Sequence, residues 1–379
     1  MMCQGGKKLD VNDKRTEAHK KRVRYGYTMA LFCAIFWGIW YVPGTFVWNF
    51  NVIEDFQMLV SGVSDMADVT NKGFLAAAIL ITALNCAFVM LSYFIWNLCL
   101  GKAKFSEMKR SIRELRCCTK YYLLGAVCGG PVAILGSFIA MGYIGGAFAA
   151  VAALAYPVIG TLLSRTWLGQ KISHRAMAGV LIIVVGSITI YAFGLLEDLQ
   201  EGGSLIGYIG GLMALCGWGI EGAVAAKGID VSEPDIAITM RFGMESLIWF
   251  IIALPALAIM SIPVYEYAWY MISDPIILLT LVMLGLTFGF CYVTWYKAFP
   301  LIGVGRGQAI GSLYGLCSVI FLVLFIGVAA AIGEDLNRSL SLVIGALLCT
   351  VGTIVMFTEK TGEVECLRDT GENSEEEQP

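Results

Sequence analysis

The sequence has few charged residues and little of the chemistry from which most catalytic sites are built. Of its 379 residues 15% are charged and 58% are hydrophobic, and only two are histidines. A soluble globular domain carries about 25% charged residues, so this balance points to lipid as the main solvent. The twelve cysteines form no CxxC pair, and no nucleophile–base pair lies in an apolar run. We therefore expect no metal, no cofactor, no disulfide framework and no enzymatic activity.

Ten apolar runs are long enough to cross a bilayer, which takes about 20 helical residues. A segment in lipid must satisfy its own backbone groups, and helices of this length do so. The predicted fold class is an all-α polytopic membrane protein with ten transmembrane helices. We place the spans at residues 27–48, 74–99, 121–143, 146–168, 176–196, 205–226, 237–261, 276–299, 304–330 and 340–357.

Charge is concentrated at the two ends of the chain and in some loops. Residues 1–26 form a basic head and residues 358–379 an acidic tail, and we expect both to be solvated and poorly ordered. Lysine and arginine also crowd the loops after the second and fourth spans, whereas the loops after the first and fifth are acidic. Basic loops stay in the cytoplasm, so both termini are expected there, in a multi-pass protein of the cell membrane. The basic head then sets topology, and we expect no nucleic-acid partner.

The second half of the chain repeats the first. Residues 144–156 match residues 302–314 at one fixed offset, and Trp37-Gly38 is echoed by Trp218-Gly219. Two copies of a five-span unit would be inverted relative to each other, because each has an odd number of spans. Inverted repeats are typical of secondary transporters that bind substrate near the midplane, between the copies. The predicted repeats are residues 27–196 and 205–357.

One acidic residue lies in the middle of an apolar run. Burying a carboxylate such as Glu221 in a bilayer costs about 2.5–3.5 kcal/mol, so an acid there is a candidate functional residue. Trp218 lies three residues earlier on the same helical face, and a carboxylate beside an aromatic ring suits an organic cation. A purely structural alternative is an ion pair with Lys227 or Lys297. A carboxylic acid in this position can also alternate between a proton and a cation.

Aromatic residues recur in the first, fourth, sixth, eighth and ninth spans. A cage for a quaternary ammonium needs several rings that face one point, although a single ring is more often part of the core. Trp37 and Trp218 occupy equivalent positions in the two repeats, and so do Tyr156 and Tyr314. Trp40 occupies the position in the first repeat that Glu221 has in the second. The predicted walls of the site are Trp37, Trp40, Tyr156, Trp218 and Tyr314; the wider set adds Tyr41, Tyr292, Trp295 and Tyr296.

Three cations near span ends are candidates for charge coupling. Arg241 precedes Glu245 by four residues, a spacing that predicts a helical ion pair. Lys297 and Arg306 lie close to the cytoplasmic ends of their spans, from which long side chains can reach the interface. If Lys297 points inward instead, it attracts an anion, which keeps a neutral or anionic metabolite open as the substrate.

Part of the chain resembles a known family. Residues 157–186, with Leu168-Gly169-Gln170-Lys171-Ile172-Ser173 between two spans, resemble the EamA repeat of the drug/metabolite transporter superfamily, whose ten spans are arranged as five plus five. Within it the chain is most similar to the LicB-type choline transporters. That resemblance implies uptake of choline or a related amine, with Glu221 and nearby aromatic residues at the substrate. The matching segments are Phe36-Trp37-Gly38, Gly130-Pro131, Tyr143-Ile144-Gly145, Ala155-Tyr156-Pro157, Trp218-Gly219-Ile220-Glu221, Arg241, Arg306 and Tyr314.

These observations predict a secondary active transporter that moves a small, choline-like organic cation across the cell membrane by alternating access. The driving force would be protons or the membrane potential, which contributes about 2.3 kcal/mol per charge per 100 mV. The expected partners are this small-molecule substrate and the membrane lipids. The alternatives are a transporter of a sugar or an amino acid, an exporter, or a non-transporting scaffold with a docking tail. The sugar alternative has a motif of its own, because Tyr41-Val42-Pro43-Gly44 resembles a segment of the sugar-uptake branch of the same superfamily.

Overall fold

A computed structural model of the chain describes residues 11–99, 109, 113–114, 116–169, 173–200, 205–229, 232–327 and 336–357. All regular secondary structure in these ranges is helical. The acidic tail, the first ten residues of the basic head and parts of the basic loops lie outside the described residues.

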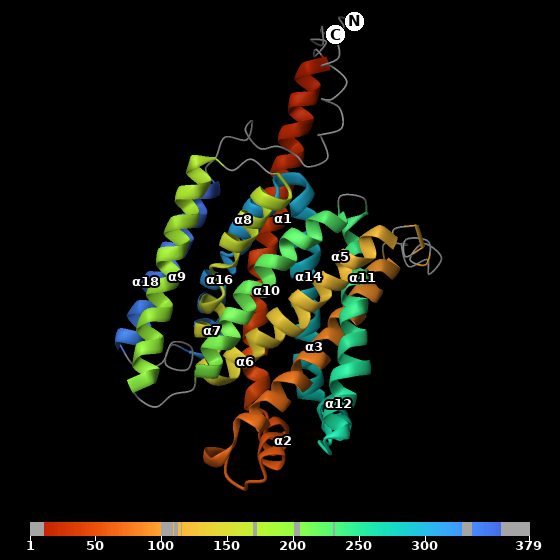
Figure 1. Cartoon of the computed structure of the whole chain (residues 1–379), viewed down its shortest axis with the longest axis vertical. Coiled ribbons are helices and arrows are strands. Elements are labelled where there is room, and N and C mark those ends of the chain that lie inside the picture. The colour runs from red at the N-terminus through yellow and green to blue at the C-terminus, as the bar shows by residue number, and fades with distance from the viewer. Residues whose placement is uncertain are drawn as a thin grey trace, which may run out of the picture.

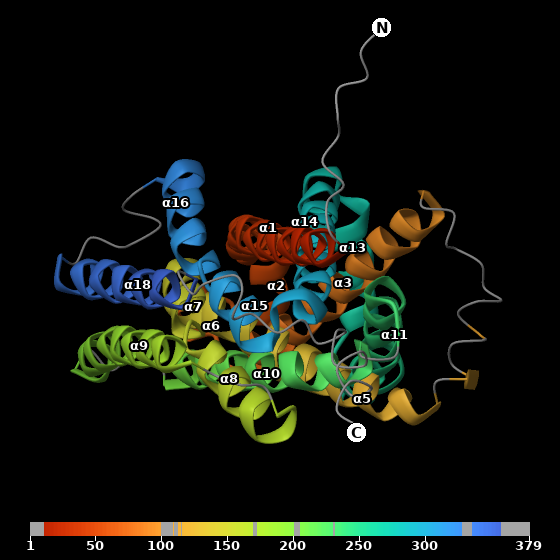
Figure 2. The same cartoon turned by 90° about the horizontal axis from the view of Figure 1, so that it is seen from above.

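Eight helical stretches of the described residues are long and apolar enough to cross a bilayer. Two shorter apolar stretches, His174–Thr189 and Leu340–Val355, fall at the predicted fifth and tenth spans. They belong to helices α9 (His174–Gln200) and α18 (Leu336–Phe357), which pack together at one side of the bundle (Figure 1 and Figure 2). The protein is therefore a multi-pass helical membrane protein. The eight stretches are Thr16–Asn49, Asn71–Cys99, Thr119–Ile144, Gly146–Trp167, Leu205–Ile229, Pro234–Ile259, Pro275–Ile302 and Val304–Ile326.

Helix α1 (Val11–Phe46) extends beyond the bundle at its N-terminal end (Figure 1). At 1.5 Å per residue its 36 residues reach about 54 Å, which exceeds the hydrocarbon core of about 30 Å. The expectation of a poorly ordered head is therefore wrong for residues 11–26. These residues continue a helix that the first span has already nucleated, and adding a residue to an existing helix is far easier than starting one.

The predicted fourth and ninth spans are each interrupted near the middle. Both begin directly after a glycine of the same conformation, with φ 81° and ψ 160° at Gly145 and φ 81° and ψ 161° at Gly303. This positive φ favours glycine, which has no Cβ to clash. Non-helical backbone at membrane depth is tolerated where protein buries it, and Ala153 and Leu154 in the first break are buried. The four segments are α7 (Gly146–Ala152), α8 (Tyr156–Trp167), α15 (Val304–Gly311) and α16 (Tyr314–Ile326).

Proline shapes the third span without breaking it. Pro131 lies inside this span, and a proline in a helix removes one backbone donor and clashes with the preceding turn. The structure has a π-helical turn, Cys128–Ile134, at this point, between α5 (Arg116–Val127) and α6 (Leu135–Ile144). A wider turn of this kind accommodates the missing hydrogen bond and is common at functional sites.

Two of the segments between spans, after the first and before the eighth, contain helices of their own. Helix α2 (Asn51–Ser61) follows the first span, and α13 (Val264–Ser273) precedes the eighth. They pack on each other, with 4.9 Å between the ring centroids of Phe56 and Tyr267. The remaining helices are α3 (Asn71–Cys99), α10 (Leu205–Ile229), α11 (Pro234–Leu247), α12 (Leu254–Ile259) and α14 (Pro275–Ile302), with a second π-helical turn, Ile248–Ala253, between α11 and α12.

Two sets of helices form the centre of the bundle. Helix α1 packs along α14 and α16, and α10 packs along α6 and α8 (Figure 2). Glycine permits the close approach of α6 and α10: a Cβ on Gly210 would lie 2.6 Å from the carbonyl oxygen of Gly136. Small residues at such crossings let helix backbones meet. The middle of α10, which carries Trp218 and Glu221, is therefore enclosed by protein.

Candidate functional site

Glu221, on α10, is fully buried and is held by three donors. Nε of Arg241 donates to its Oε1 at 2.6 Å, and the hydroxyl of Tyr292 donates to its Oε2 at 2.8 Å. The hydroxyl of Tyr296 also donates to Oε1, at 3.2 Å. Helices α11 and α14 therefore supply the hydrogen bonds that make burial of this carboxylate tolerable.

Arg241 joins Glu221 to a second buried acid. Its Nη1 donates to Oε2 of Glu245, which is the ion pair expected from the four-residue spacing. Nε1 of Trp249 donates to the other oxygen of Glu245 at 3.0 Å. We call Glu221, Arg241 and Glu245 the charge cluster; all three are 0% exposed. When all three are ionised their charges sum to −1, and an uncompensated charge is costly in a low-dielectric interior.

Aromatic rings and glycines surround the guanidinium of Arg241. Its central carbon lies 3.9 Å from the ring centroid of Phe242 and 5.0 Å from that of Tyr292, within the range of cation–π attraction. Nη2 has no hydrogen-bond partner among the described residues. A Cβ on Gly129 would collide with Nη2, and one on Gly130 would collide with the carboxyl group of Glu245. Glycine at these positions therefore leaves the space that the charge cluster occupies.

The lysines once considered as partners of Glu221 lie elsewhere. Nζ of Lys227 lies 5.8 Å from the ring centroid of Trp167. Nζ of Lys297 pairs with Oδ1 of Asp235 at 3.0 Å, and its side chain is 22% exposed. The alternative of an ion pair between Glu221 and either lysine is wrong, because Arg241 takes that place. Arg306, the third candidate for charge coupling, is half-buried near the start of α15.

Four of the five predicted aromatic residues meet at the centre of the bundle. Trp37 stacks on Tyr314, with centroids 4.4 Å apart and planes 15° apart, and meets Trp218 edge-on at 4.6 Å and 87°. Tyr156 lies 5.6 Å from Trp37, and so does Trp295. All five residues are fully buried. These five rings, which we call the aromatic cluster, come from α1, α8, α10, α14 and α16.

Trp40, the fifth predicted residue, belongs to a neighbouring group. Its ring stacks on Phe288 at 4.4 Å, and its Nε1 donates to Oδ1 of Asn85 at 3.1 Å. Phe288 in turn lies 6.4 Å from Trp37. Trp40 therefore supports the aromatic cluster from behind Phe288.

A chain of hydrogen bonds links the aromatic cluster to the charge cluster. Nε1 of Trp218 donates to the hydroxyl of Tyr292 at 3.0 Å, and that hydroxyl donates to Glu221. The side-chain Nε2 of Gln308, on α15, donates to the backbone carbonyl of Trp218 at 3.0 Å. The backbone carbonyl of Gln308 accepts a hydrogen bond from the hydroxyl of Tyr156 at 2.7 Å. Sequence reasoning missed Gln308, although an amide inside an apolar run is a signal of the same kind as Glu221.

Polar atoms in and beside the aromatic cluster are buried without a hydrogen-bond partner in the described part of the chain. They are Nε1 of Trp37, Nε1 of Trp295 and Oε1 of Gln308. A buried polar atom left unsatisfied costs about 1–3 kcal/mol. The two indole donors belong to the aromatic cluster, whereas the acceptor on Gln308 lies against Gly160, where an added Cβ would collide with it.

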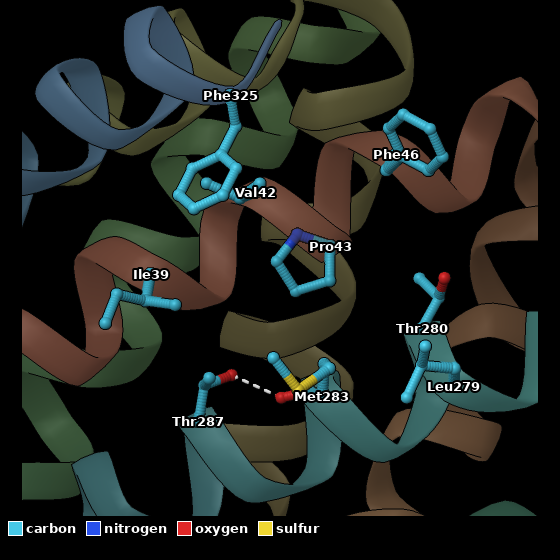
Figure 3. A pocket seen from close by; sticks show the side chains of 9 residues that line it. All are labelled: Ile39, Val42, Pro43, Phe46, Leu279, Thr280, Met283, Thr287 and Phe325. Carbon is cyan, nitrogen blue, oxygen red and sulfur yellow. Dashed lines mark hydrogen bonds between the residues drawn. The ribbon is translucent and has the colours of Figure 1, made fainter. Parts of the chain in front are cut away.

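A separate groove lies between α1, α14 and α16 (Figure 3). It has a volume of about 240 Å³, and none of its lining residues is charged. The hydroxyls of its two threonines, Thr280 and Thr287, donate to carbonyls of their own helix. This groove suits an apolar chain and offers nothing to balance a cation. Its lining is Ile39, Val42, Pro43, Phe46, Leu279, Thr280, Met283, Thr287 and Phe325.

Comparison with known proteins gives a family for part of the chain and a fold for most of it. Residues 68–192 match the EamA-like transporter family. No curated protein matches the sequence. Chains of solved structures do match: one, a crystal structure described only as that of a protein, has a TM-score of 0.51 and 15% identity over 89% of this chain and 98% of its own. At that identity the likeness shows the fold alone. The family match covers less than half of the chain and, together with the apolar helices, supports a relation of this part to the EamA-like transporters of the drug/metabolite transporter superfamily.

Proposed function

We propose that the protein is a secondary active transporter of a small organic cation, such as a choline-like quaternary amine. The observation that carries this proposal is the charge cluster, two carboxylates and one guanidinium buried beside five aromatic rings. The cluster has a net charge of −1 when ionised, so one monovalent cation or one proton neutralises it. Trp37, Tyr156, Trp218 and Tyr314 would form the walls of the site, and Glu221 would balance the charge of the substrate.

The proposed architecture is ten spans in two inverted five-span repeats, residues 27–196 and 205–357. Two features of the fold support it. The fourth and ninth spans begin after glycines of the same conformation and break near the middle. The packing is also exchanged between the halves: the first span packs on the eighth and ninth, and the sixth packs on the third and fourth. Substrate at the boundary between such repeats would be exposed to each side in turn.

The proposed orientation has both termini in the cytoplasm of a cell-membrane protein. The basic head and the basic loops after the second and fourth spans support it. Import of a cation would then be driven by the membrane potential, which supplies about 2.3 kcal/mol per charge per 100 mV, or by exchange with a proton at Glu221.

A second candidate is a transporter, or exporter, of an anionic or neutral metabolite such as an amino acid or a sugar. Nη2 of Arg241, which has no hydrogen-bond partner in the described ranges of the chain, favours it, because a buried guanidinium nitrogen is a strong donor to a carboxylate or a hydroxyl. The two candidates differ in the group that holds the substrate: Glu221 for a cation and Arg241 for an anion.

Uptake by proteoliposomes tests the proposal. Purified protein is reconstituted, a negative-inside potential or a pH gradient is imposed, and uptake of labelled choline is measured. Wild type should concentrate choline, Glu221→Gln should not, and Glu266→Gln should behave as wild type because Glu266 lies outside the charge cluster, bonded to Tyr270 on α13. If uptake of every amine tested survives Glu221→Gln, the cation site is wrong. Uptake of sugars or amino acids without uptake of amines would favour the second candidate.

A further inference from the structure

We infer that Arg241 is a tethered competitor of the substrate: its guanidinium occupies the cation position at Glu221, and a substrate cation binds there only when Arg241 turns wholly onto Glu245. This inference rests on the proposed function, since it concerns the same carboxylate. It assigns to Arg241 the control of substrate affinity, and to Glu245 the role of an alternative partner.

The surroundings of the guanidinium are those that an organic cation would need. One carboxylate oxygen lies 2.6 Å from Nε, and two rings lie 3.9 Å and 5.0 Å from the central carbon. A carboxylate together with aromatic faces is a general way to bind a cation in a water-free site. Tyr292 contributes to both parts, because its ring faces the guanidinium and its hydroxyl bonds Glu221. Arg241 and a substrate cation therefore require the same groups.

Glu245 makes the exchange possible without a free charge. It lies one turn from Arg241 on α11 and already accepts a hydrogen bond from Nη1. If the guanidinium releases Glu221 and keeps Glu245, that pair is neutral and Glu221 carries the single negative charge. A monovalent cation at Glu221 then brings the total to zero. The guanidinium only has to pivot about the bond that it keeps.

The structure also leaves Arg241 incompletely held. Five N–H groups are available on a guanidinium, yet Nη2 has no hydrogen-bond partner among the residues that the structure describes. Nη2 faces Gly129, at a place where any larger residue would collide with it. Because the N–H groups of Nη2 have no partner to lose in the part of the chain that the structure describes, a change of partner by Arg241 breaks fewer hydrogen bonds than it would for a fully bonded guanidinium.

Substitutions in the charge cluster separate a competitor from a merely structural ion pair. With all groups ionised, wild type has a net charge of −1, Glu245→Gln has 0 and Arg241→Gln has −2. The double variant Arg241→Gln/Glu245→Gln returns to −1, because it loses one charge of each sign. It therefore keeps the wild-type charge and Glu221 but has no internal cation, which makes it the matched test of competition.

The experiment measures choline binding to purified protein by isothermal titration calorimetry, with a thermal unfolding curve for each variant to show that it is folded. Glu245→Gln should weaken binding by about tenfold or more, because Arg241 then has no partner except Glu221. The double variant should restore binding. If Glu221 is free of Arg241 in about one tenth of wild-type molecules, the double variant should bind about tenfold more tightly than wild type.

Each outcome is decisive. If wild type binds choline and the double variant binds no better than Glu245→Gln, Arg241 is a structural partner of Glu221; the inference is overturned while the proposed function stands. If neither wild type nor the double variant binds choline or tetramethylammonium, the proposed function fails and takes the inference with it. Tighter binding by the double variant than by wild type, at the same net charge, is the result that identifies the arginine as a competitor of the ligand.

Discussion

Replacing Arg241 with glutamine should destabilise the protein strongly. The substitution removes the cation of the charge cluster and leaves Glu221 and Glu245 close together, both 0% exposed. Breaking a buried ion pair by removing one partner costs about 3–5 kcal/mol, because the charge left behind is uncompensated. Arg241 also has two desolvated cation–π contacts, which can contribute about 2 kcal/mol. We expect Arg241→Gln to lower the free energy of unfolding by about 3–5 kcal/mol.

The double variant Arg241→Gln/Glu245→Gln should be more stable than Arg241→Gln although it carries one more substitution. It removes the second carboxylate, and Glu221 keeps the hydroxyls of Tyr292 and Tyr296 as donors. Arg241→Lys should lie between wild type and Arg241→Gln, since an ammonium keeps the charge but lacks the planar fork that reaches two carboxylates.

The assay is unfolding of purified protein in dodecyl maltoside with increasing dodecyl sulfate, followed by tryptophan fluorescence. Wild type, the two single variants at Arg241 and the double variant are compared under identical conditions. A loss of less than about 1 kcal/mol for Arg241→Gln, as for an exposed ion pair, would refute the reasoning. A double variant less stable than Arg241→Gln would refute it too. That result would mean that repulsion between Glu221 and Glu245 does not destabilise Arg241→Gln.

Three further predictions follow from individual contacts. Gly129→Ala should cost about 1–3 kcal/mol of stability and weaken choline binding. Gly125→Ala, whose Cβ would lie 3.7 Å from Arg241, is the control and should do neither. Equal choline affinities of the two variants in titration calorimetry would contradict this. Tyr292→Phe should cost about 1–3 kcal/mol and exceed Tyr296→Phe, because only Tyr292 also accepts a bond from an indole; the same unfolding assay decides. Lys297→Met should cost about 0–1 kcal/mol and leave choline uptake intact, since its ion pair is partly exposed; lost uptake would favour the anion candidate.

Much of the candidate site could be assembled from the sequence. Glu221 stood out as an acid in an apolar run, and the repeat singled out Trp37, Trp218 and Tyr314, which the structure brings together. The ion pair between Arg241 and Glu245 followed from helical spacing. Each of these inferences uses either local periodicity or internal repetition, and both can be read from one sequence.

The partner of Glu221 could not be predicted in the same way. Glu221 and Arg241 lie on different helices, α10 and α11, and no periodicity within one helix says which faces of two helices meet. The break in the fourth span was missed because hydropathy stays high through it: Ala153 and Leu154, which lie in the break, are apolar residues. Helix α13 was missed because it is short and lies between two long spans.

The most direct test of the central claim is choline binding by purified wild type and by Glu221→Gln. The claim is that a buried carboxylate, between an arginine and a group of aromatic rings, holds an organic cation. We predict saturable binding of choline to wild type and none to Glu221→Gln, which has lost the negative charge but little of the volume. Equal affinity of the two proteins for choline would contradict the account.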